Sequence, residues 1–266
     1  AMPTNKPIAF VLSATHHGTM IVNRNDYCGS MAPGQGFGVG HQLLNYSQFD
    51  PPEINTVLSL LNLRRHYFGD GVVALDGGAN IGVHSLEWSR LMYGWGQIIA
   101  FEAQRWVFYD LAGKLALNNC FNVDARWAAL GSSNGTLDIP VPNYTQPASF
   151  GSLELQSSST NEFIGQQINY AKEHLRQVPM ISLDSWQLPR VDFIKVDVEG
   201  MEMSVLQGAL HTLQHCRPIL WVETLKSKTE DIQQLLHDCG YRHFHPIGPN
   251  MLVLHENDPC HQHVQL

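Results

Sequence analysis

Short apolar runs alternate along this chain with segments in which apolar residues recur every three or four positions. The runs occupy residues 72–75, 97–101, 123–130, 193–197 and 218–222. Short runs predict buried strands, whereas the wider spacing predicts amphipathic helices, because an α-helix returns to the same face about every 3.6 residues. Strands that alternate with helices predict β-α-β units, and therefore a parallel sheet with helices on both faces.

The helical spacing appears in five segments. The first begins at Asp50, a suitable N-cap ahead of two prolines, and continues through Val57 and Leu61. The other four segments cover residues 81–92, 107–115, 206–213 and 232–239. Each lies between two of the apolar runs or just before the end of the chain, as a parallel α/β fold requires.

The two ends of the chain follow other patterns. Apolar runs at 241–245 and 251–255 are joined by five residues, which is too short for a parallel crossover, so they predict an antiparallel pair. Residues 1–50 are rich in Gly and Asn and predict an extension of short strands and loops, ahead of a main domain over 51–266. Within that domain, the polar and Ser-rich residues 132–180 predict an insertion that serves as a lid or substrate loop.

Composition narrows the class of protein. The chain has 16 basic and 24 acidic side chains, a formal charge of −8, which disfavours binding to nucleic acid. No apolar run approaches the roughly 20 residues that span a bilayer. The five cysteines are scattered and form no C-x-x-C pair, which favours a reducing, cytoplasmic location over a disulfide framework or a zinc site. Nothing in the sequence indicates the number of subunits.

The strongest local signal is the stretch LDGGANIG at residues 75–82. A strand ends there, the chain turns on glycines and a helix begins, so a ligand can approach bare backbone at the positive end of a helix. Asp76 stands at the strand tip, where it would repel a pyrophosphate and attract a cation. The dinucleotide fingerprint is only partly matched, because Gly77 and Gly82 occupy its first and last positions but Ala79 its middle one. Asp76 therefore favours S-adenosylmethionine over NAD.

Glu102 follows the second apolar run, 26 residues after Asp76. A carboxylate at that point is placed to hold two ribose hydroxyls. Together, Asp76 and Glu102 predict an adenosine-type cofactor at the carboxyl edge of the sheet. His84, in the first turn of the following helix, is a further candidate contact, whereas the other histidines lack the spacing of metal ligands.

A third signal is the stretch DFIKVDVEGME at residues 192–202. Strand periodicity places Lys195, Asp197 and Glu199 on one face if the strand runs that far, and Glu223 ends the next strand at the same edge. Neighbouring carboxylates raise each other's pKa, so their convergence needs a reason. A cationic ligand, general-base work on a hydroxyl, a divalent metal bound by Asp197 and Glu223, and an ion-pair network closed by Lys195 all remain open.

At these residues the sequence resembles the FkbM family of S-adenosylmethionine-dependent methyltransferases. The matching stretches are LDGGANIGVHSL (75–86), IIAFEAQ (98–104), AALGSSNG (128–135), SFGSL (149–153), LDSWQLPRVDFIKVDVEGMEMSVLQGA (183–209), RPILWVE (217–223) and NMLVL (250–254). They occur in the family's order over about residues 45–255. Gly77 and Ala103 depart from it, because the family more often has an apolar residue and a proline there.

The resemblance implies a role for each matching position. The methionine end of the cofactor is framed by Asp76, Gly78, Asn80 and Gly82, and the ribose is held by Glu102. The site of methyl transfer is lined by Asp197 and Glu199. Glu53 fits an acidic position that such proteins often carry upstream of the first strand.

The sequence thus predicts a Rossmann-like class I methyltransferase of the α/β class, with a seven-stranded, mostly parallel sheet, an antiparallel last strand and a small N-terminal β extension. We expect O-methylation of a hydroxyl on a sugar, a glycan or a small metabolite, with Asp197 or Glu199 as the base and Glu223 as second choice. Two alternatives are an NAD-dependent oxidoreductase and a non-catalytic S-adenosylmethionine-binding protein.

Overall fold

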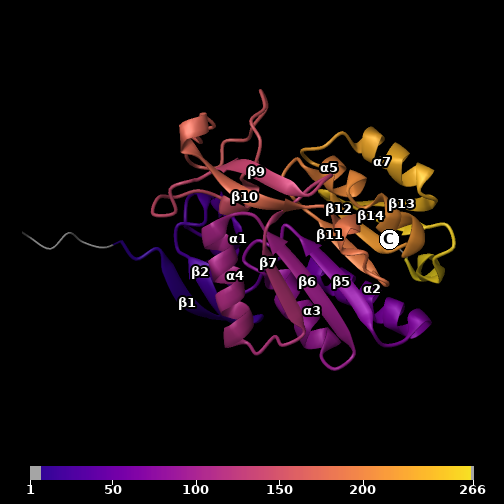
Figure 1. The fold of residues 1–266 in the computed structure, drawn as a ribbon. Coiled ribbons are helices and arrows are strands. Elements are labelled where there is room, and N and C mark those ends of the chain that lie inside the picture. The colour runs from indigo at the N-terminus through magenta and orange to yellow at the C-terminus, as the bar shows by residue number, and fades with distance from the viewer. Residues whose placement is uncertain (1–6, 265–266) are drawn as a thin grey trace, which may run out of the picture.

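A seven-stranded sheet forms the centre of the molecule (Figure 1). The structure is a computed structural model that describes residues 7–264. The strand order is β13-β14-β12-β11-β5-β6-β7. The strands are β5 (Val72–Gly77), β6 (Gly96–Glu102), β7 (Val123–Trp127), β11 (Phe193–Val196), β12 (Ile219–Glu223), β13 (Tyr241–Ile247) and β14 (Asn250–His255). Neighbours from β7 to β12 pair in parallel, and β14 is antiparallel to both β12 and β13. The predicted sheet with its antiparallel last strand is confirmed.

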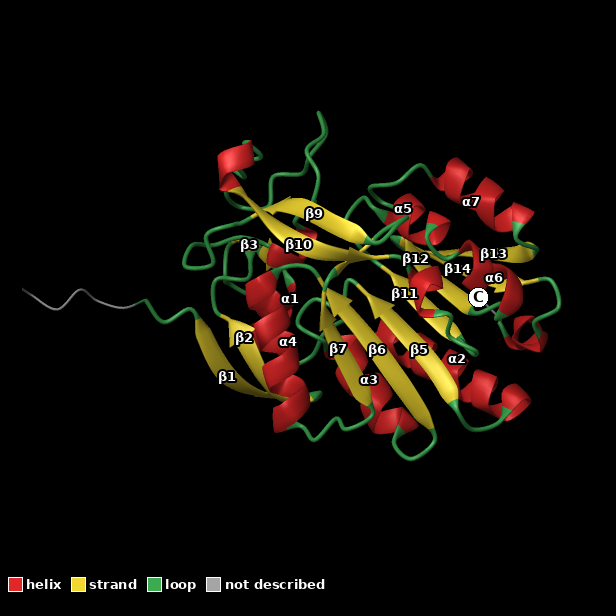
Figure 2. Ribbon diagram, in the orientation of Figure 1, coloured by secondary structure: helices red, strands yellow, loops and turns green. Residues whose placement is uncertain are grey.

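Helices cover both faces of this sheet (Figure 2). One face packs against α2 (Pro51–Phe68), α3 (Val83–Met92) and α4 (Arg105–Leu117), and the other against α5 (Glu202–Gln207), α6 (Leu210–His215) and α7 (Thr229–Asp238). Side chains alternate between the faces along each strand. In β11, for example, Phe193 packs with Trp88 of α3, whereas Ile194 belongs to the cluster that contains Leu206 of α5. Because helices cover both faces of the sheet, the strands are almost continuously apolar.

Two predicted elements are divided in the structure. The apolar run 123–130 gives β7 and then the short β8 (Ala129–Leu130), which leaves the central sheet for a three-stranded one. The helix predicted over 206–213 is interrupted between α5 and α6. There the carbonyl of Gly208 accepts hydrogen bonds from the hydroxyl of Ser182 and from the backbone N–H of Asp184. The carboxylate of Asp184 in turn accepts hydrogen bonds from the backbone N–H groups of His211 and Thr212 in the first turn of α6. These tertiary partners satisfy the backbone groups that a continuous helix would pair internally.

The N-terminal residues form short strands, as predicted, and also one helix that was not predicted. The strands are β1 (Phe10–Thr15), β2 (Gly18–Asn23), β3 (Cys28–Gly29) and β4 (Gly36–Phe37), and the helix is α1 (Val39–Tyr46). No local cap side chain precedes α1; instead, the carboxylate of Asp26 accepts a hydrogen bond from the N–H of Gly40. Because this cap comes from a residue distant in sequence, the usual start signal is missing. Residues 1–6 of the predicted extension lie outside the described residues.

The segment 132–180 places a hairpin beside the carboxyl edge of the main sheet. Strands β9 (Gly135–Pro140) and β10 (Leu175–Ile181) pair antiparallel, and β10 also pairs with β8. The long connection between them contains the 3-10 turns η1 (Phe150–Ser152) and η2 (Lys172–His174). Two further turns, η3 (Leu183–Trp186) and η4 (Pro259–His263), lie outside this segment. Among the described residues, no helix is long and apolar enough to cross a membrane.

A buried ion pair lies where α4 packs against the N-terminal hairpin. Lys114 is fully buried, its Nζ is 2.8 Å from Oδ1 of Asp110, and it also donates to the carbonyl of Ile21 in β2. Burial lowers the pKa of Lys114 to about 8, although Asp110 opposes that shift. The charges of Lys114 and Asp110 therefore stabilise each other inside the protein.

We expect the Lys114→Met substitution to lower the free energy of unfolding by about 3–5 kcal/mol, because Asp110 then stays buried without a cation. Urea denaturation measures the change. The double variant Lys114→Met with Asp110→Leu removes both charges and is expected to recover most of the loss. A double variant as unstable as the single one would contradict this account of the pair.

Candidate active site

The turn after β5 lies directly against the end of β11. Gly78 has a φ of 73°, and a Cβ added to it would lie 1.8 Å from the carbonyl oxygen of Asp197. Glycine is therefore required for both its conformation and its lack of a side chain. The close approach places the glycine turn and the carboxylates after β11 at one point of the sheet edge.

Glu102, the last residue of β6, is 6% exposed and lines a cavity beside that turn. Its carboxylate accepts hydrogen bonds from the backbone N–H groups of Asn80, at 2.9 Å, and Gln104, at 2.7 Å. Burial raises the pKa of Glu102 to about 7, while these two hydrogen bonds oppose the shift. Glu102 thus holds the glycine turn in place and presents a carboxyl group to the cavity.

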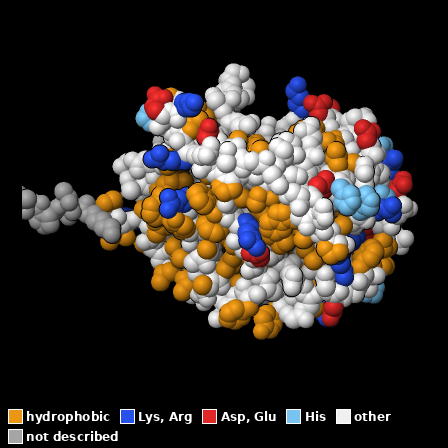
Figure 3. Space-filling view, in the orientation of Figure 1, with side chains coloured by type: hydrophobic (Ala, Val, Ile, Leu, Met, Phe, Trp, Pro, Cys, Tyr) orange, Lys and Arg blue, Asp and Glu red, His pale blue; other side chains and the backbone are white. Residues whose placement is uncertain are grey.

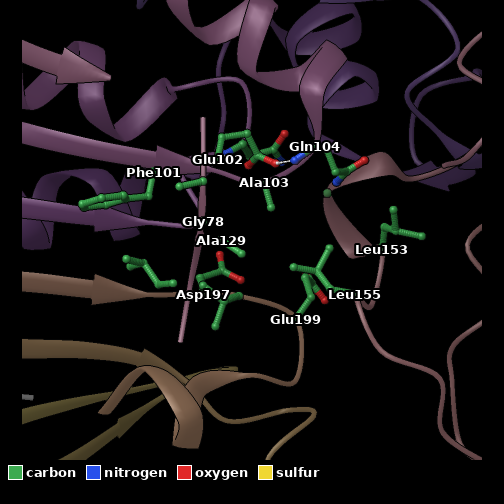
Figure 4. Close-up of a pocket in the computed structure, with 15 residues that line it drawn as sticks. Gly78, Phe101, Glu102, Ala103, Gln104, Ala129, Leu153, Leu155, Asp197 and Glu199 are labelled. Atoms are coloured by element: carbon green, nitrogen blue, oxygen red, sulfur yellow. Dashed lines mark hydrogen bonds between the residues drawn. The ribbon is translucent and has the colours of Figure 1, made fainter. Parts of the chain in front are cut away.

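The first cavity has a volume of about 540 Å³, part of which is open to solvent. Figure 4 shows Glu102 and Gln104 on one side of it and Asp197 and Glu199 on the other. Apolar side chains complete the wall, namely Phe101, Ala103, Ala128, Ala129, Leu130, Leu153, Leu155 and Val198. A mostly apolar cavity with the carboxylate of Glu102 in its wall suits an adenosine group, whose base is apolar on its faces and whose ribose carries two hydroxyls.

A second, larger cavity of about 1160 Å³ adjoins the first. Both are lined by Gly78, Asn80, Gly151, Asp197 and Glu199, so these residues stand where the two spaces meet. The remaining wall comes from distant parts of the chain: residues 37–42 of the N-terminal region, the start of α2, the start of α3, the segment 149–152, and the ends of β12 and β14. The site therefore consists of two adjoining spaces that share part of their lining.

Three carboxylates converge at the shared point, as the sequence predicted. One ligand atom from each of Asp197, Glu199 and Glu223 lies within 4.8 Å of the others. The sequence placed Glu199 on the same strand face as Lys195 and Asp197 if the strand ran that far. In the structure β11 ends at Val196, and Glu199 has a φ of 55°. A tight turn, rather than an extended strand, therefore brings Glu199 to the cluster.

Two lysines share the negative charge of this cluster. Lys195 lies 2.9 Å from Oδ2 of Asp197 and 3.9 Å from Oδ1 of Asp76, and Lys226 contacts Glu199. Burial opposes the charge of Lys195, but Asp197 and Asp76 outweigh it and its pKa is raised. The ion-pair network considered from the sequence is thus present.

Two members of the cluster have strongly shifted pKa values. Burial and the charges of Asp197 and Glu223 raise the pKa of Glu199 well above its usual value, although Lys226 opposes the shift. Burial and the charges of Asp197 and Glu202 likewise raise the pKa of Glu223, and one oxygen of Glu223 has no hydrogen-bond partner among the described residues. Both groups therefore favour a proton or a nearby cation.

Asp76 and Gly77 do not line either cavity. Asp76 is fully buried, and its Oδ2 accepts a hydrogen bond from Ser85 at 2.6 Å. Its nearest cation is Lys195, which lies between it and Asp197. Gly77 belongs to β5, where a Cβ would lie 2.9 Å from the carbonyl oxygen of Lys195. Direct contact of these two residues with a cofactor stays a prediction.

Glu53 and His84 line the second cavity and contact each other. Oε1 of Glu53 is 3.0 Å from Nε2 of His84, and Oε2 of Glu53 accepts a hydrogen bond from Asn250 at 2.9 Å. Burial would raise the pKa of Glu53, but the hydrogen bond and charge of His84 and the charge of Lys195 outweigh it, so the pKa is lowered. Glu53, His84 and Gly82 therefore line the second cavity, whereas Glu102 lines only the first.

Two residues of the site received no role from the sequence, although they lie in stretches quoted above. Glu202 accepts hydrogen bonds from the N–H groups of Val198 and Gly200 and so fixes the turn that carries Glu199. Gln104 donates to the carbonyl of Phe150 and thereby ties the segment 149–152 to Glu102. The SFGSL stretch, which was noted only as part of the family resemblance, was the available signal for that segment.

The fold and this site together define a Rossmann-like class I methyltransferase. Residues 76–243 match the model of the family described as "Methyltransferase FkbM domain", which covers more than half of the chain. The chain belongs to this FkbM family of S-adenosylmethionine-dependent methyltransferases. Members of this family are methyltransferases. The family therefore differs from the NAD-dependent oxidoreductases, which the glycine-rich turn also allowed.

Two curated relatives and one solved structure illustrate the similarity. The chain is 31% identical over 149 residues to "Methyltransferase 1" of Beauveria bassiana, covering 53% of this chain and 59% of that protein. It is 29% identical over 188 residues to "Methyltransferase sdnD" of Sordaria araneosa, covering 63% and 72%. The crystal structure of methyltransferase FkbM from Methylobacillus flagellatus matches with a TM-score of 0.50 at 16% identity, over 73% of this chain and 48% of that one.

We expect the Gly78→Ala substitution to weaken binding of S-adenosylhomocysteine at least about tenfold and to destabilise the fold by about 1–3 kcal/mol, because the new Cβ meets the backbone of Asp197. Calorimetric titration and urea denaturation measure the two effects. Gly135→Ala is the matched control, since a Cβ there meets nothing within 4 Å. Normal affinity and stability of Gly78→Ala would show that the turn does not depend on this contact.

The raised pKa of Glu223 predicts a pH-dependent stability. The folded protein keeps the proton of Glu223 to higher pH than the unfolded chain, so stability is full below about pH 4.5 and is lost as the pH rises through the folded pKa. We therefore expect Glu223→Gln to stabilise the ligand-free protein by about 1–2 kcal/mol at pH 8.5 and to change little at pH 5. Urea denaturation at both pH values, with exposed Glu173→Gln as control, measures this. A variant that is less stable at pH 8.5 would disprove it.

Proposed function

We propose that this chain transfers the methyl group of S-adenosylmethionine to a hydroxyl oxygen of a sugar, a glycan or a small metabolite. The adenosine would occupy the first cavity, with its ribose hydroxyls donating to Glu102. The buried position of Glu102 and its neighbours on the glycine turn support this placement. The methionine end would then cross the turn toward the second cavity, near Asn80 and Gly82.

The junction of the two cavities is the observation that carries the proposal. A donor in the first cavity and an acceptor in the second would meet beside Asp197 and Glu199, which line both. Methyl transfer needs the acceptor oxygen in line with the sulfonium carbon, and holding two reactants in that geometry supplies much of the rate. The carboxylates would also stabilise the positive sulfonium before transfer.

Asp197 is our first choice for the base. As the new O–CH₃ bond forms and the S–CH₃ bond breaks, the hydroxyl proton would pass to the Asp197 carboxylate, and S-adenosylhomocysteine would leave. Glu199 and Glu223 are less suited at neutral pH, because their raised pKa values favour the protonated form. Lys195 would orient Asp197 through their 2.9 Å contact.

A divalent metal is the alternative use of the same carboxylates. Asp197 and Glu223 have the oxygen ligands that Mg²⁺ or Ca²⁺ prefers, and their spacing fits a shared ion. Lys195 and Lys226 already bring positive charge to this cluster, so we propose that transfer proceeds without a metal. Full activity after exhaustive chelation is the expected result, and loss of activity restored by Mg²⁺ would favour the metal.

We expect Asp197→Asn to lower kcat at least about 100-fold while S-adenosylhomocysteine, which lacks the sulfonium charge, binds within about threefold of the original affinity, because the amide keeps the shape of the side chain but cannot take a proton. Transfer of radiolabelled methyl groups to a panel of sugars and polyols, and calorimetric titration with S-adenosylhomocysteine, separate the two quantities. Asp138→Asn, on β9 away from both cavities, is the control. Undiminished turnover in Asp197→Asn would remove it from the role of base.

A further inference from the structure

The second cavity is lined by side chains of mostly one charge. Its carboxylates are Asp50, Glu53, Asp197, Glu199 and Glu223, whereas Lys195 is its one lining lysine or arginine among the described residues. On the outer face seen in Figure 3, by contrast, acidic and basic side chains are scattered among uncharged ones. This excess of acidic groups bears on what the cavity can bind.

Most of these carboxylates already have partners. Asp197 pairs with Lys195 and Glu199 with Lys226. Glu53 lies beside His84, and Asp50 accepts a hydrogen bond from the N–H of Glu53 at the start of α2.

Glu223 is the exception. Among the residues that the structure describes, no lysine, arginine or histidine lies within ion-pair distance of it, and its Oε2 has no hydrogen-bond partner. The five carboxyl groups of this space outnumber the positive groups, even with Lys226 and the single net positive charge of S-adenosylmethionine added. Glu223 is half-buried and its inner oxygen has no partner, so a cation beside it would stabilise the ionised form of this side chain.

A second buried polar group in the same wall lacks a partner. His84 is 6% exposed, lines the cavity, and its Nδ1 makes no hydrogen bond within the described part of the chain. Asn250, which holds Glu53, is paired in register with Glu223 across β14 and β12, so His84, Glu53, Asn250 and Glu223 follow one another along this wall. The wall thus offers polar groups at two separate points.

Another part of the lining is apolar. Phe37, Val39, Phe49 and Pro249 contribute hydrocarbon or ring surface to the cavity. Carbon atoms of an acceptor would pack there, while its polar groups would face the carboxylates. The combination suits a molecule with a hydrocarbon or sugar-ring body and a positively charged substituent.

We propose that the acceptor carries an ammonium group that binds Glu223, and hence that it belongs to the amino sugars or amino alcohols. This inference rests on the proposed function, because it assigns the first cavity to the cofactor and the second to the acceptor. The ammonium would satisfy the free oxygen of Glu223, and the hydroxyl of the same molecule would face Asp197. Phosphorylated or carboxylated acceptors would be repelled.

Three probes of one shape test the proposal: cyclohexylamine, cyclohexanol and cyclohexanecarboxylate, each titrated at pH 7 into protein saturated with S-adenosylhomocysteine. We expect the protonated amine to bind at least about tenfold more tightly than the alcohol, and the carboxylate to bind least. Added NaCl should narrow the difference, because salt screens the charges at the cavity mouth. Ligand-detected NMR or calorimetry gives the three dissociation constants.

Glu223→Gln should abolish the preference for the amine, whereas Glu173→Gln, an exposed residue outside the cavity, should leave it unchanged. Equal binding of amine and alcohol, tighter binding of the carboxylate, or no binding of any probe would overturn the proposal. So would a preference that survives in Glu223→Gln. Failure of the protein to bind S-adenosylhomocysteine would overturn the proposed function itself. The two failures can be told apart, because binding of S-adenosylhomocysteine is measured before any probe is added.

Discussion

The site depends on one close approach between two pieces of backbone. Gly78 lies against the carbonyl of Asp197 with no room for a side chain between them. That contact joins the turn after β5 to the turn after β11, two strands that are neighbours in the sheet although more than a hundred residues separate them in sequence. The glycine turn, Glu102 and the carboxylates are consequently held at one point of the sheet edge, where a cofactor and an acceptor would meet.

The second constraint is electrostatic. The protein holds three half-buried carboxylates close together and compensates them only in part with Lys195 and Lys226. Like charges in such a place raise one another's pKa and lower the stability of the ligand-free fold at alkaline pH. Proteins retain unfavourable charge of this kind mainly at functional sites, where a ligand of the opposite charge relieves it. Under the proposed function, the sulfonium donor would be one such ligand.

Much of the fold was predictable because local patterns and tertiary environment agree. The apolar runs became the central strands, and the short link between 245 and 251 fixed the antiparallel pair. The divided helix α5–α6 and the helix α1 were not predicted, because Asp184 and Asp26 cap them from distant positions in the sequence. The strand β8 was not separated from β7, because its partner β10 is also distant in sequence. The convergence of Asp197 and Glu223 followed from their places at strand ends, whereas the turn that carries Glu199 and the roles of Glu202 and Gln104 depend on contacts that no periodicity reveals.

A crystal structure of the protein with S-adenosylhomocysteine tests the central claim most directly. The account predicts the ribose within hydrogen-bond distance of Glu102 and the adenine among the apolar residues of the first cavity. It also predicts the sulfur where the two cavities meet, beside Gly78 and Asp197 and facing the second cavity. A ligand bound at any other place, or a ribose turned away from Glu102, would contradict the account.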